Sequence, residues 1–83
     1  MTKKILEQCT EFAGWVGVVL ILLAYALLSF GVFDSTDARY HGLNLLGGVG
    51  IIVDAFADKN YQPVVLNLIW VAIAVYAIVR TIV

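Results

Sequence analysis

One carboxylate lies inside a strongly apolar stretch of the sequence and is the first candidate for chemistry. It is Asp54, in the run GIIVDAF at residues 50–56. Ionisable side chains inside membrane spans are energetically costly, and they usually face a polar interior and mark a path for a solute or proton. The alternative is a carboxylate at the membrane boundary, where its helix ends. The sequence leaves both interpretations open.

Two asparagines and a tryptophan are the other candidates for lining a solute path: Asn44, Asn67 and Trp70. Counting about 1.5 Å per residue from the middle of each apolar run places Asp54 and Asn67 in one polar layer, with Trp15 and Gly14 of the first run at a similar level. The same count places Asn44 in another layer, nearer the opposite side. Asn67 and Lys59 are then candidate partners for Asp54. The alternatives are hydrogen bonds between helices for the asparagines and packing against lipid or protein for Trp70.

The residue combinations that catalysis requires are missing from the sequence. We find no nucleophile with a base, no phosphate-binding loop and no metal-ligand spacing, since His41 has no second His or Cys three or four residues further on. Cys9 is the only cysteine, so it has no internal disulfide partner. We therefore expect no enzyme activity, no metal and no cofactor.

The composition indicates that lipid surrounds this chain. Of its 83 residues, 63% are hydrophobic and 13% are charged, whereas soluble domains average about half apolar and a quarter charged. So short a chain cannot bury this apolar excess in its own core. The net charge is −1 and the five basic residues are scattered, so we expect no binding to nucleic acid.

Three apolar runs predict three transmembrane helices, because each is long enough to cross most or all of a hydrocarbon core of about 30 Å. The expected fold class is an all-α membrane protein, a small bundle that oligomerisation completes. A cleaved signal peptide is the alternative for the first run, which is however too long for one. The predicted spans are residues 12–33, 41–57 and 64–83, with loops at 34–40 and 58–63. Residues 1–11 are predicted to be an interfacial segment, either helical or a solvated tail.

Small residues mark where these helices are expected to pack. In lipid, helices associate through close contact at small side chains and through hydrogen bonds. Moving a leucine side chain from lipid into a helix interface gives no hydrophobic stabilisation, because lipid tails are equally apolar. The second run is the predicted packing centre, and a ligand approaching bare backbone is the alternative role for its glycines. The predicted helix-packing residues are Gly14, Gly17, Gly47, Gly48 and Gly50.

Two resemblances follow from longer stretches of sequence. The segments WVGVVLILLAYALLSFG, LNLLGGVGI and PVVLNLIWVAIAVYAIV together resemble a family of uncharacterised small bacterial membrane proteins. More distantly, a third span that begins with Pro63 and carries Asn67 a turn later resembles the SemiSWEET half-transporters. That resemblance implies a parallel dimer around a sugar site, with Asn67 in the pocket and Trp70 as a stacking wall. The first span has no proline, so it departs from the hinge of those transporters.

The function that these features favour is a homo-oligomeric channel or half-transporter for a small polar solute. Three helices alone enclose no cavity larger than a few side chains, and transporter sites commonly form between repeats. The alternative is an accessory or scaffolding subunit of a larger membrane complex, and a lipid-facing sensor ranks below both. Lys3, Lys4 and Lys59 on one side outnumber Arg39 and Arg80 on the other, which favours a multi-pass protein of the bacterial inner membrane with a cytoplasmic N-terminus.

Overall fold

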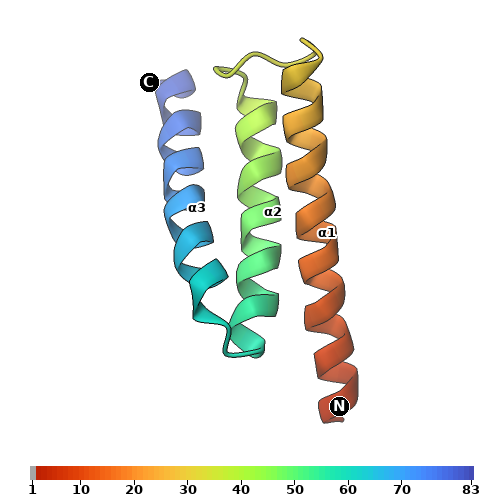
Figure 1. The fold of residues 1–83 in the computed structure, drawn as a ribbon. Helices are drawn as coiled ribbons and strands as arrows, with labels where there is room; N and C mark the ends of the chain where they lie inside the picture. Colours follow the sequence, from red (N-terminus) through yellow and green to blue (C-terminus); the bar gives the residue numbers. More distant parts are fainter. Residues whose placement is uncertain (1) are drawn as a thin grey trace.

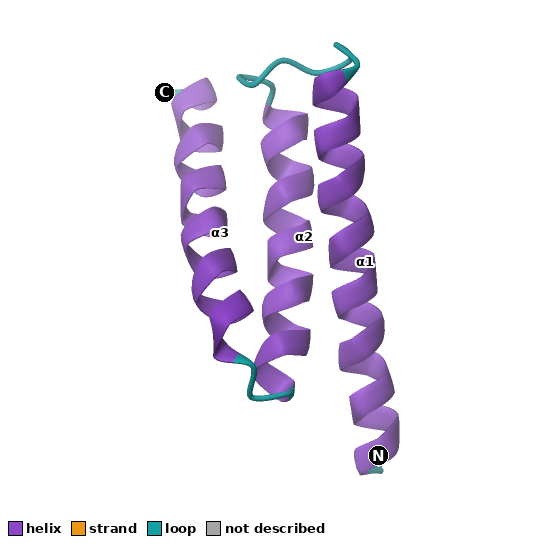
Figure 2. Ribbon diagram, viewed as in Figure 1, coloured by secondary structure: helices purple, strands orange, loops and turns teal. Residues whose placement is uncertain are grey.

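The computed structural model describes residues 2–83 and consists of three long helices joined by short turns (Figure 2). They are α1 (Lys3–Ser29), α2 (Ala38–Ala57) and α3 (Tyr61–Ile82), and no strand occurs within residues 2–83. All three are long and apolar enough to cross a membrane, with mean hydropathies of 2.2, 1.2 and 2.0 over their most apolar windows. The predicted all-α fold with three membrane-spanning helices is therefore confirmed.

The helices lie side by side with α2 in the middle (Figure 1). Within residues 2–83, α2 packs against both α1 and α3, whereas α1 and α3 are not neighbours. The two ends of the chain lie at opposite ends of the molecule (Figure 1). Helix α2 is thus the packing centre, and it is the helix richest in glycine.

Helix α1 begins well before the apolar run that predicts the first span. The Thr2 hydroxyl accepts a hydrogen bond from the Ile5 backbone N–H at 3.3 Å, which satisfies one of the free donors at the helix N-terminus. From Lys3 onward the N-terminal segment is helical and continues without a break into the apolar run. Of the two interpretations of residues 1–11, the helical one therefore describes the part from Lys3 onward.

Both α1 and α2 end in a Schellman motif, which reverses the chain within a few residues. At the end of α1, Gly31 has a φ of +81°, and the Val32 N–H donates to the Leu27 carbonyl at 2.9 Å. At the end of α2, Lys59 takes the equivalent position with a φ of +57°, and the Asn60 N–H donates to the Ala55 carbonyl at 2.9 Å. These bonds satisfy carbonyls that would otherwise lack partners at the helix ends. They stop α1 at Ser29, four residues before the predicted span ends at residue 33.

The interface between α1 and α2 is built on glycines that allow the two backbones to touch. A Cβ placed on Gly47 would lie 2.7 Å from the Gly17 carbonyl oxygen, and one on Gly50 would lie 2.5 Å from the Ala13 carbonyl oxygen. A Cβ on Gly17 would likewise clash with the Gly47 carbonyl oxygen. Such close approach is typical of helix pairs in membranes.

The interface between α2 and α3 uses a different face of α2. A Cβ on Gly48 would lie 2.8 Å from Val71 Cγ2 and 3.7 Å from Asn67 Oδ1. Ala55 of α2 is also buried, as is Ala74 of α3. The glycines at positions 14, 17, 47, 48 and 50 therefore all lie in close contacts between helices of the same chain.

Candidate functional site

Asp54 lies in the last turn of α2 and faces α1, where Gly14 makes room for it. A Cβ placed on Gly14 would lie 2.7 Å from both the Cβ and the Cγ of Asp54, and would also overlap one of its carboxylate oxygens. Any larger residue at position 14 would therefore displace the carboxylate. The close approach that glycine permits here holds an acidic side chain between two membrane-spanning helices.

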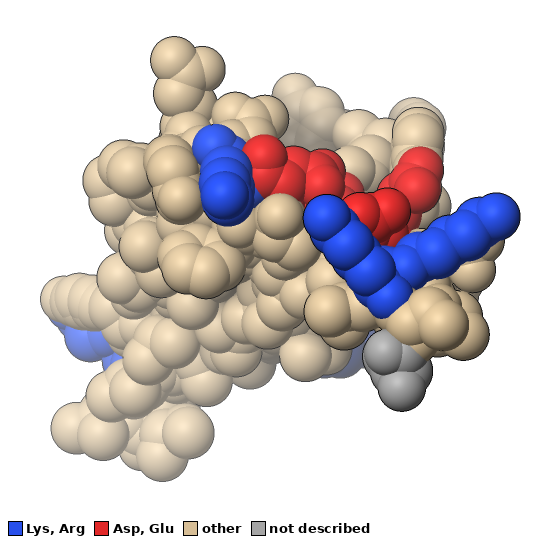
Figure 3. All heavy atoms as spheres, turned by 90° about the horizontal axis from the view of Figure 1, so that it is seen from below, with Lys and Arg blue, Asp and Glu red and all other residues tan. Residues whose placement is uncertain are grey.

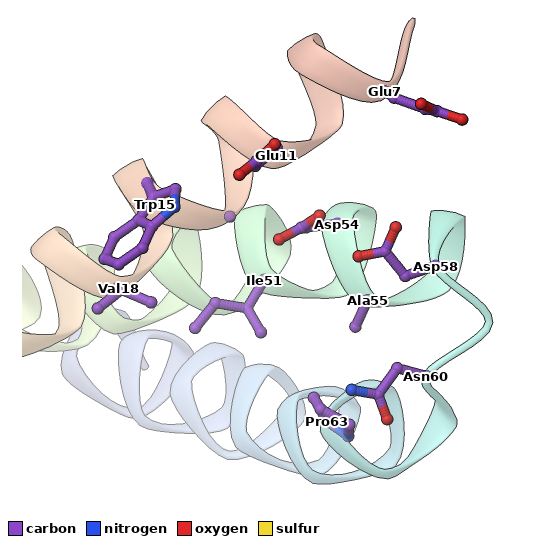
Figure 4. Close-up of a pocket in the computed structure, with 11 residues that line it drawn as sticks. Glu7, Glu11, Trp15, Val18, Ile51, Asp54, Ala55, Asp58, Asn60 and Pro63 are labelled. Carbon is purple, nitrogen blue, oxygen red and sulfur yellow. The ribbon is translucent and has the colours of Figure 1, made fainter. Parts of the chain in front are cut away.

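The Asp54 carboxylate opens onto a hollow of about 550 Å³ at the end of the molecule where α2 turns into α3. Trp15 and Val18 of α1 form one wall, and Ile51 and Ala55 of α2 form another (Figure 4). Asn60 and Pro63 close it on the side of α3. We call this space the acidic hollow, because three further carboxylates line it: Glu7, Glu11 and Asp58.

The charges in the acidic hollow are of one sign. Glu11 and Asp54 come from different helices and face each other across it (Figure 4). No lysine or arginine is among the described residues that line it. Seen from this end of the molecule, acidic side chains gather in the middle and basic ones lie to either side (Figure 3). The interior of the hollow therefore attracts cations and repels anions.

The predicted partners of Asp54 are not brought to it. Asp54 faces α1, whereas Asn67 approaches α2 from the side of α3, where a Cβ added to Gly48 would lie 3.7 Å from Asn67 Oδ1. Within residues 2–83 the one ion pair joins Arg39 and Asp37, with Nη2 and Oδ2 2.8 Å apart, so Lys59 forms none with Asp54.

Asn44 and Asn67 are both buried where α2 packs on α3, with 4% and 6% of their surfaces exposed. Each side-chain amide donates to the carbonyl four residues earlier on its own helix. The Asn67 bond to Pro63 measures 2.8 Å, and the Asn44 bond to Tyr40 measures 3.1 Å. The amide groups thus have partners without any bond between helices. A role for Asn67 or Asn44 in lining a solute path stays a prediction, and it requires α2 and α3 to separate.

Trp70 lies apart from the acidic hollow, on α3. It borders a hollow of about 140 Å³ together with Asn44 and His41, and 42% of its surface is exposed. That space is too small to hold more than a few water molecules, since one water occupies about 30 Å³ in the liquid. Of the four predicted solute-binding residues, Asp54 alone lines the acidic hollow. Asn44 and Trp70 border the smaller hollow, and Asn67 is buried between α2 and α3.

The sequence analysis placed Gly14 and Trp15 at the level of Asp54 but missed the contribution of Glu7 and Glu11 to this site. Glu7, Glu11 and Trp15 follow one another at intervals of four residues, the spacing that places side chains on one face of a helix. This signal was present in the sequence. It was overlooked because residues 1–11 were treated as separate from the first span. Without one continuous helix, the sequence did not indicate that Glu7 and Glu11 lie on the same helix face as Trp15.

Within residues 2–83, no group of three or more His, Cys, Asp or Glu side chains is placed to hold a metal ion.

Comparison with known proteins assigns the chain to a family. The model of a protein family of unknown function matches residues 10–83. The chain belongs to that family. The match takes in all of α2 and α3 and most of α1. No curated protein and no solved structure matches the chain.

The first of the two predicted resemblances is thus confirmed in its broad form. A family of unknown function covers most of the chain, and three apolar helices fit a small membrane protein. A likeness to the SemiSWEET half-transporters is not found.

Proposed function

We propose that this protein is a homo-oligomeric carrier or channel for a small polar solute, with cations favoured over anions. The observation that carries the proposal is the placement of Asp54: a carboxylate within an apolar helix, fitted against Gly14 and open to a hollow of about 550 Å³. Ionisable groups at such positions commonly mark the path of a solute or proton. The acidic hollow would be the entrance of this path.

Oligomerisation is part of the proposal because a single chain has helices on only some sides of the hollow. Since α1 and α3 each pack on α2 alone, a second copy is needed to surround a path that continues past Asp54 into the membrane. A SemiSWEET-like dimer is one form such an assembly would take. We place the protein in the bacterial inner membrane, with the acidic hollow on the cytoplasmic side.

Flux from vesicles tests this proposal. The full-length protein is reconstituted into proteoliposomes loaded with a small organic cation, a neutral sugar and an organic anion, and their efflux is compared. Asp54→Asn keeps the size of the side chain and removes its charge, and we expect it to lower cation efflux about tenfold, the effect of losing one charged hydrogen bond. Asp34→Asn, in the turn at the opposite end, is the matched control and should leave efflux unchanged.

The oligomeric state of the same preparations completes the test. We expect a defined oligomer in detergent for the wild type, for Asp54→Asn and for Asp34→Asn. Equal efflux from the two variants, or no efflux above that of empty vesicles, would overturn the transport proposal. A wild-type protein that stays monomeric would overturn the oligomeric path.

A second candidate function is that of an accessory subunit in a larger membrane complex. The observation in its favour is that the outward faces of α1 and α3 are apolar and have no neighbour among the described helices. The glycine faces themselves do not support it, because they are occupied by contacts within the chain. Loss of a co-purifying membrane protein after substitutions on these outward faces, with no solute flux in the wild type, would favour this function.

A further inference from the structure

A second hollow lies at the opposite end of the molecule from the acidic hollow, between the turn that joins α1 to α2 and the end of α3. Its volume is about 410 Å³. We call this space the Arg80 hollow. The residues that line it are Ser35, Thr36, His41, Ala77, Arg80 and Thr81. Among these described residues there is no carboxylate, and most carry a group that can donate a hydrogen bond.

Arg80 supplies a positive charge that no acidic side chain within residues 2–83 pairs with. Its guanidinium donates to the Tyr76 hydroxyl at 2.9 Å and forms no ion pair within residues 2–83. Asp37, which follows Thr36 in the chain, is paired with Arg39: hydrogen bonds from the Arg39 side chain and backbone hold the pKa of Asp37 below its ordinary value. Asp37 therefore stays ionised and paired at neutral pH, and Arg80 is left to interact with a negative group from outside the chain.

The wall of the hollow opposite Arg80 is held in place by His41. His41 Nε2 lies 2.6 Å from the Ser35 carbonyl oxygen, and because a carbonyl only accepts, the ring nitrogen is the donor. This bond ties the first turn of α2 to the segment that carries the Ser35 and Thr36 hydroxyls. The hydroxyls are thus presented on a fixed turn rather than on a loose loop.

An apolar groove adjoins the Arg80 hollow and runs toward the middle of α3. It has a volume of about 480 Å³ and is lined by Ile69, Ala72, Ile73, Tyr76 and Ala77. Ala77 lines both spaces, and Tyr76 lines the groove while its hydroxyl bonds Arg80. The large side chains of the groove are exposed, with Ile69 at 58% and Ile73 at 59%. In a bilayer this surface faces lipid.

The dimensions fit one lipid molecule. From Ile69 to Arg80 the helix rises about 16 Å, roughly half of a 30 Å hydrocarbon core and therefore the depth of one leaflet. Arg80 lies two residues before the end of α3 at Ile82. A long basic side chain near the end of a membrane-spanning helix reaches the level of the headgroup phosphates. An acyl chain along the groove would place the phosphate of its lipid beside Arg80.

We propose that the apolar groove of α3 and the Arg80 hollow form a binding site for an anionic phospholipid, with an acyl chain against Ile69, Ile73 and Ala77 and the phosphate held by Arg80. The side chains of the turn at Ser35 and Thr36 donate hydrogen bonds to the same headgroup. This site is separate from the acidic hollow and does not depend on the proposed transport.

Native mass spectrometry of the full-length protein in detergent tests the site by titration with phosphatidylglycerol and phosphatidylcholine. We expect phosphatidylglycerol to bind more tightly, and Arg80→Gln to weaken its binding about five- to tenfold through the loss of charge-assisted hydrogen bonds. Lys4→Gln changes the net charge equally at the other end of the molecule and should change the affinity less than about twofold. Ala77→Phe fills the junction of groove and hollow and should weaken the binding of both lipids.

Circular dichroism and the elution volume show whether each variant is folded. Arg80 is exposed, so its substitution does not disturb packing, and Arg80→Gln tests the site even if Ala77→Phe fails to fold. An equal loss of affinity for phosphatidylglycerol in Arg80→Gln and Lys4→Gln would overturn the proposal, because it would indicate a general effect of net charge. Displacement of phosphatidylglycerol by millimolar inorganic phosphate would also overturn it, since the ligand would then be free phosphate and not a lipid.

Discussion

Single glycines determine how the two N-terminal helices meet. Gly17 and Gly47 are each placed so that an added Cβ would run into the backbone of the other helix. Gly42, in the first turns of α2, has nothing within 4 Å of such a Cβ. The same residue type therefore has opposite roles at different positions of one chain: at Gly17 it permits a contact, whereas at Gly42 it only lowers helix propensity.

Alanine at these two positions is expected to shift stability in opposite directions. Gly17→Ala should lower the free energy of unfolding by about 1–3 kcal/mol, the usual cost of overpacking a close contact. Gly42→Ala should raise it by roughly 0.5–1 kcal/mol, because alanine is the better helix former. Unfolding in mixed micelles, followed by circular dichroism, measures both. A Gly17→Ala variant as stable as the wild type would show that α1 and α2 do not pack through this glycine.

At the scale of the helices, the turns decide where each helix ends and the side chains decide which faces meet. The first span predicted from hydropathy runs to residue 33, but the Schellman motif at Gly31 stops α1 at Ser29. Local hydrogen bonds thus end the helix at a point where the apolar residues still continue. The second Schellman motif places Lys59 at a positive φ, which costs an L-residue with a side chain about 1 kcal/mol or more.

Glycine at position 59 should therefore stabilise the protein. We expect Lys59→Gly to raise the free energy of unfolding by roughly 0.5–1 kcal/mol, because glycine adopts the left-handed conformation without a steric cost. Lys59→Ala is the matched control, since it removes the same charge and keeps the strain. Thermal unfolding of both variants in detergent gives the comparison. If the two variants had equal stability, the turn would not hold residue 59 in this conformation.

At the scale of the whole molecule, the row of three helices separates two polar ends. The acidic hollow lies at the end that holds the turn from α2 to α3, and the Arg80 hollow lies at the other end. Because α1 and α3 each contact only α2, both ends stay open on one side. The excess of lysine at the acidic end predicts that this end faces the cytoplasm.

Cysteine labelling from either side of the membrane tests this orientation. Cys9 is first replaced by Ser, and Thr36→Cys or Asn60→Cys is then introduced in the two turns that flank α2. In bacterial spheroplasts, a membrane-impermeant maleimide should label position 36 directly and position 60 only after permeabilisation. The reverse pattern would contradict the orientation, and labelling of both positions from one side would contradict the crossing by α2.

The sequence by itself determined the class of this protein and the number of its helices. Long apolar runs separated by polar turns admit few other structures, because in lipid every backbone polar group must be paired within the segment. The same reasoning found the glycines of the helix contacts and singled out Asp54. These features depend on composition and on local spacing, which the sequence states directly.

Only the tertiary structure decided which of these residues meet. The sequence grouped Asp54 with Asn67 by depth, but depth does not specify the direction in which a side chain points around its helix. The structure turns Asp54 toward α1 and buries Asn67 against Gly48 on another face of α2. It also brings Glu7 and Glu11 to the hollow of Asp54, because α1 starts at Lys3 and stays in one helical phase. Rotation about the helix axis and the order in which helices pack depend on contacts between segments distant in the chain, and the three-dimensional fold alone supplies them.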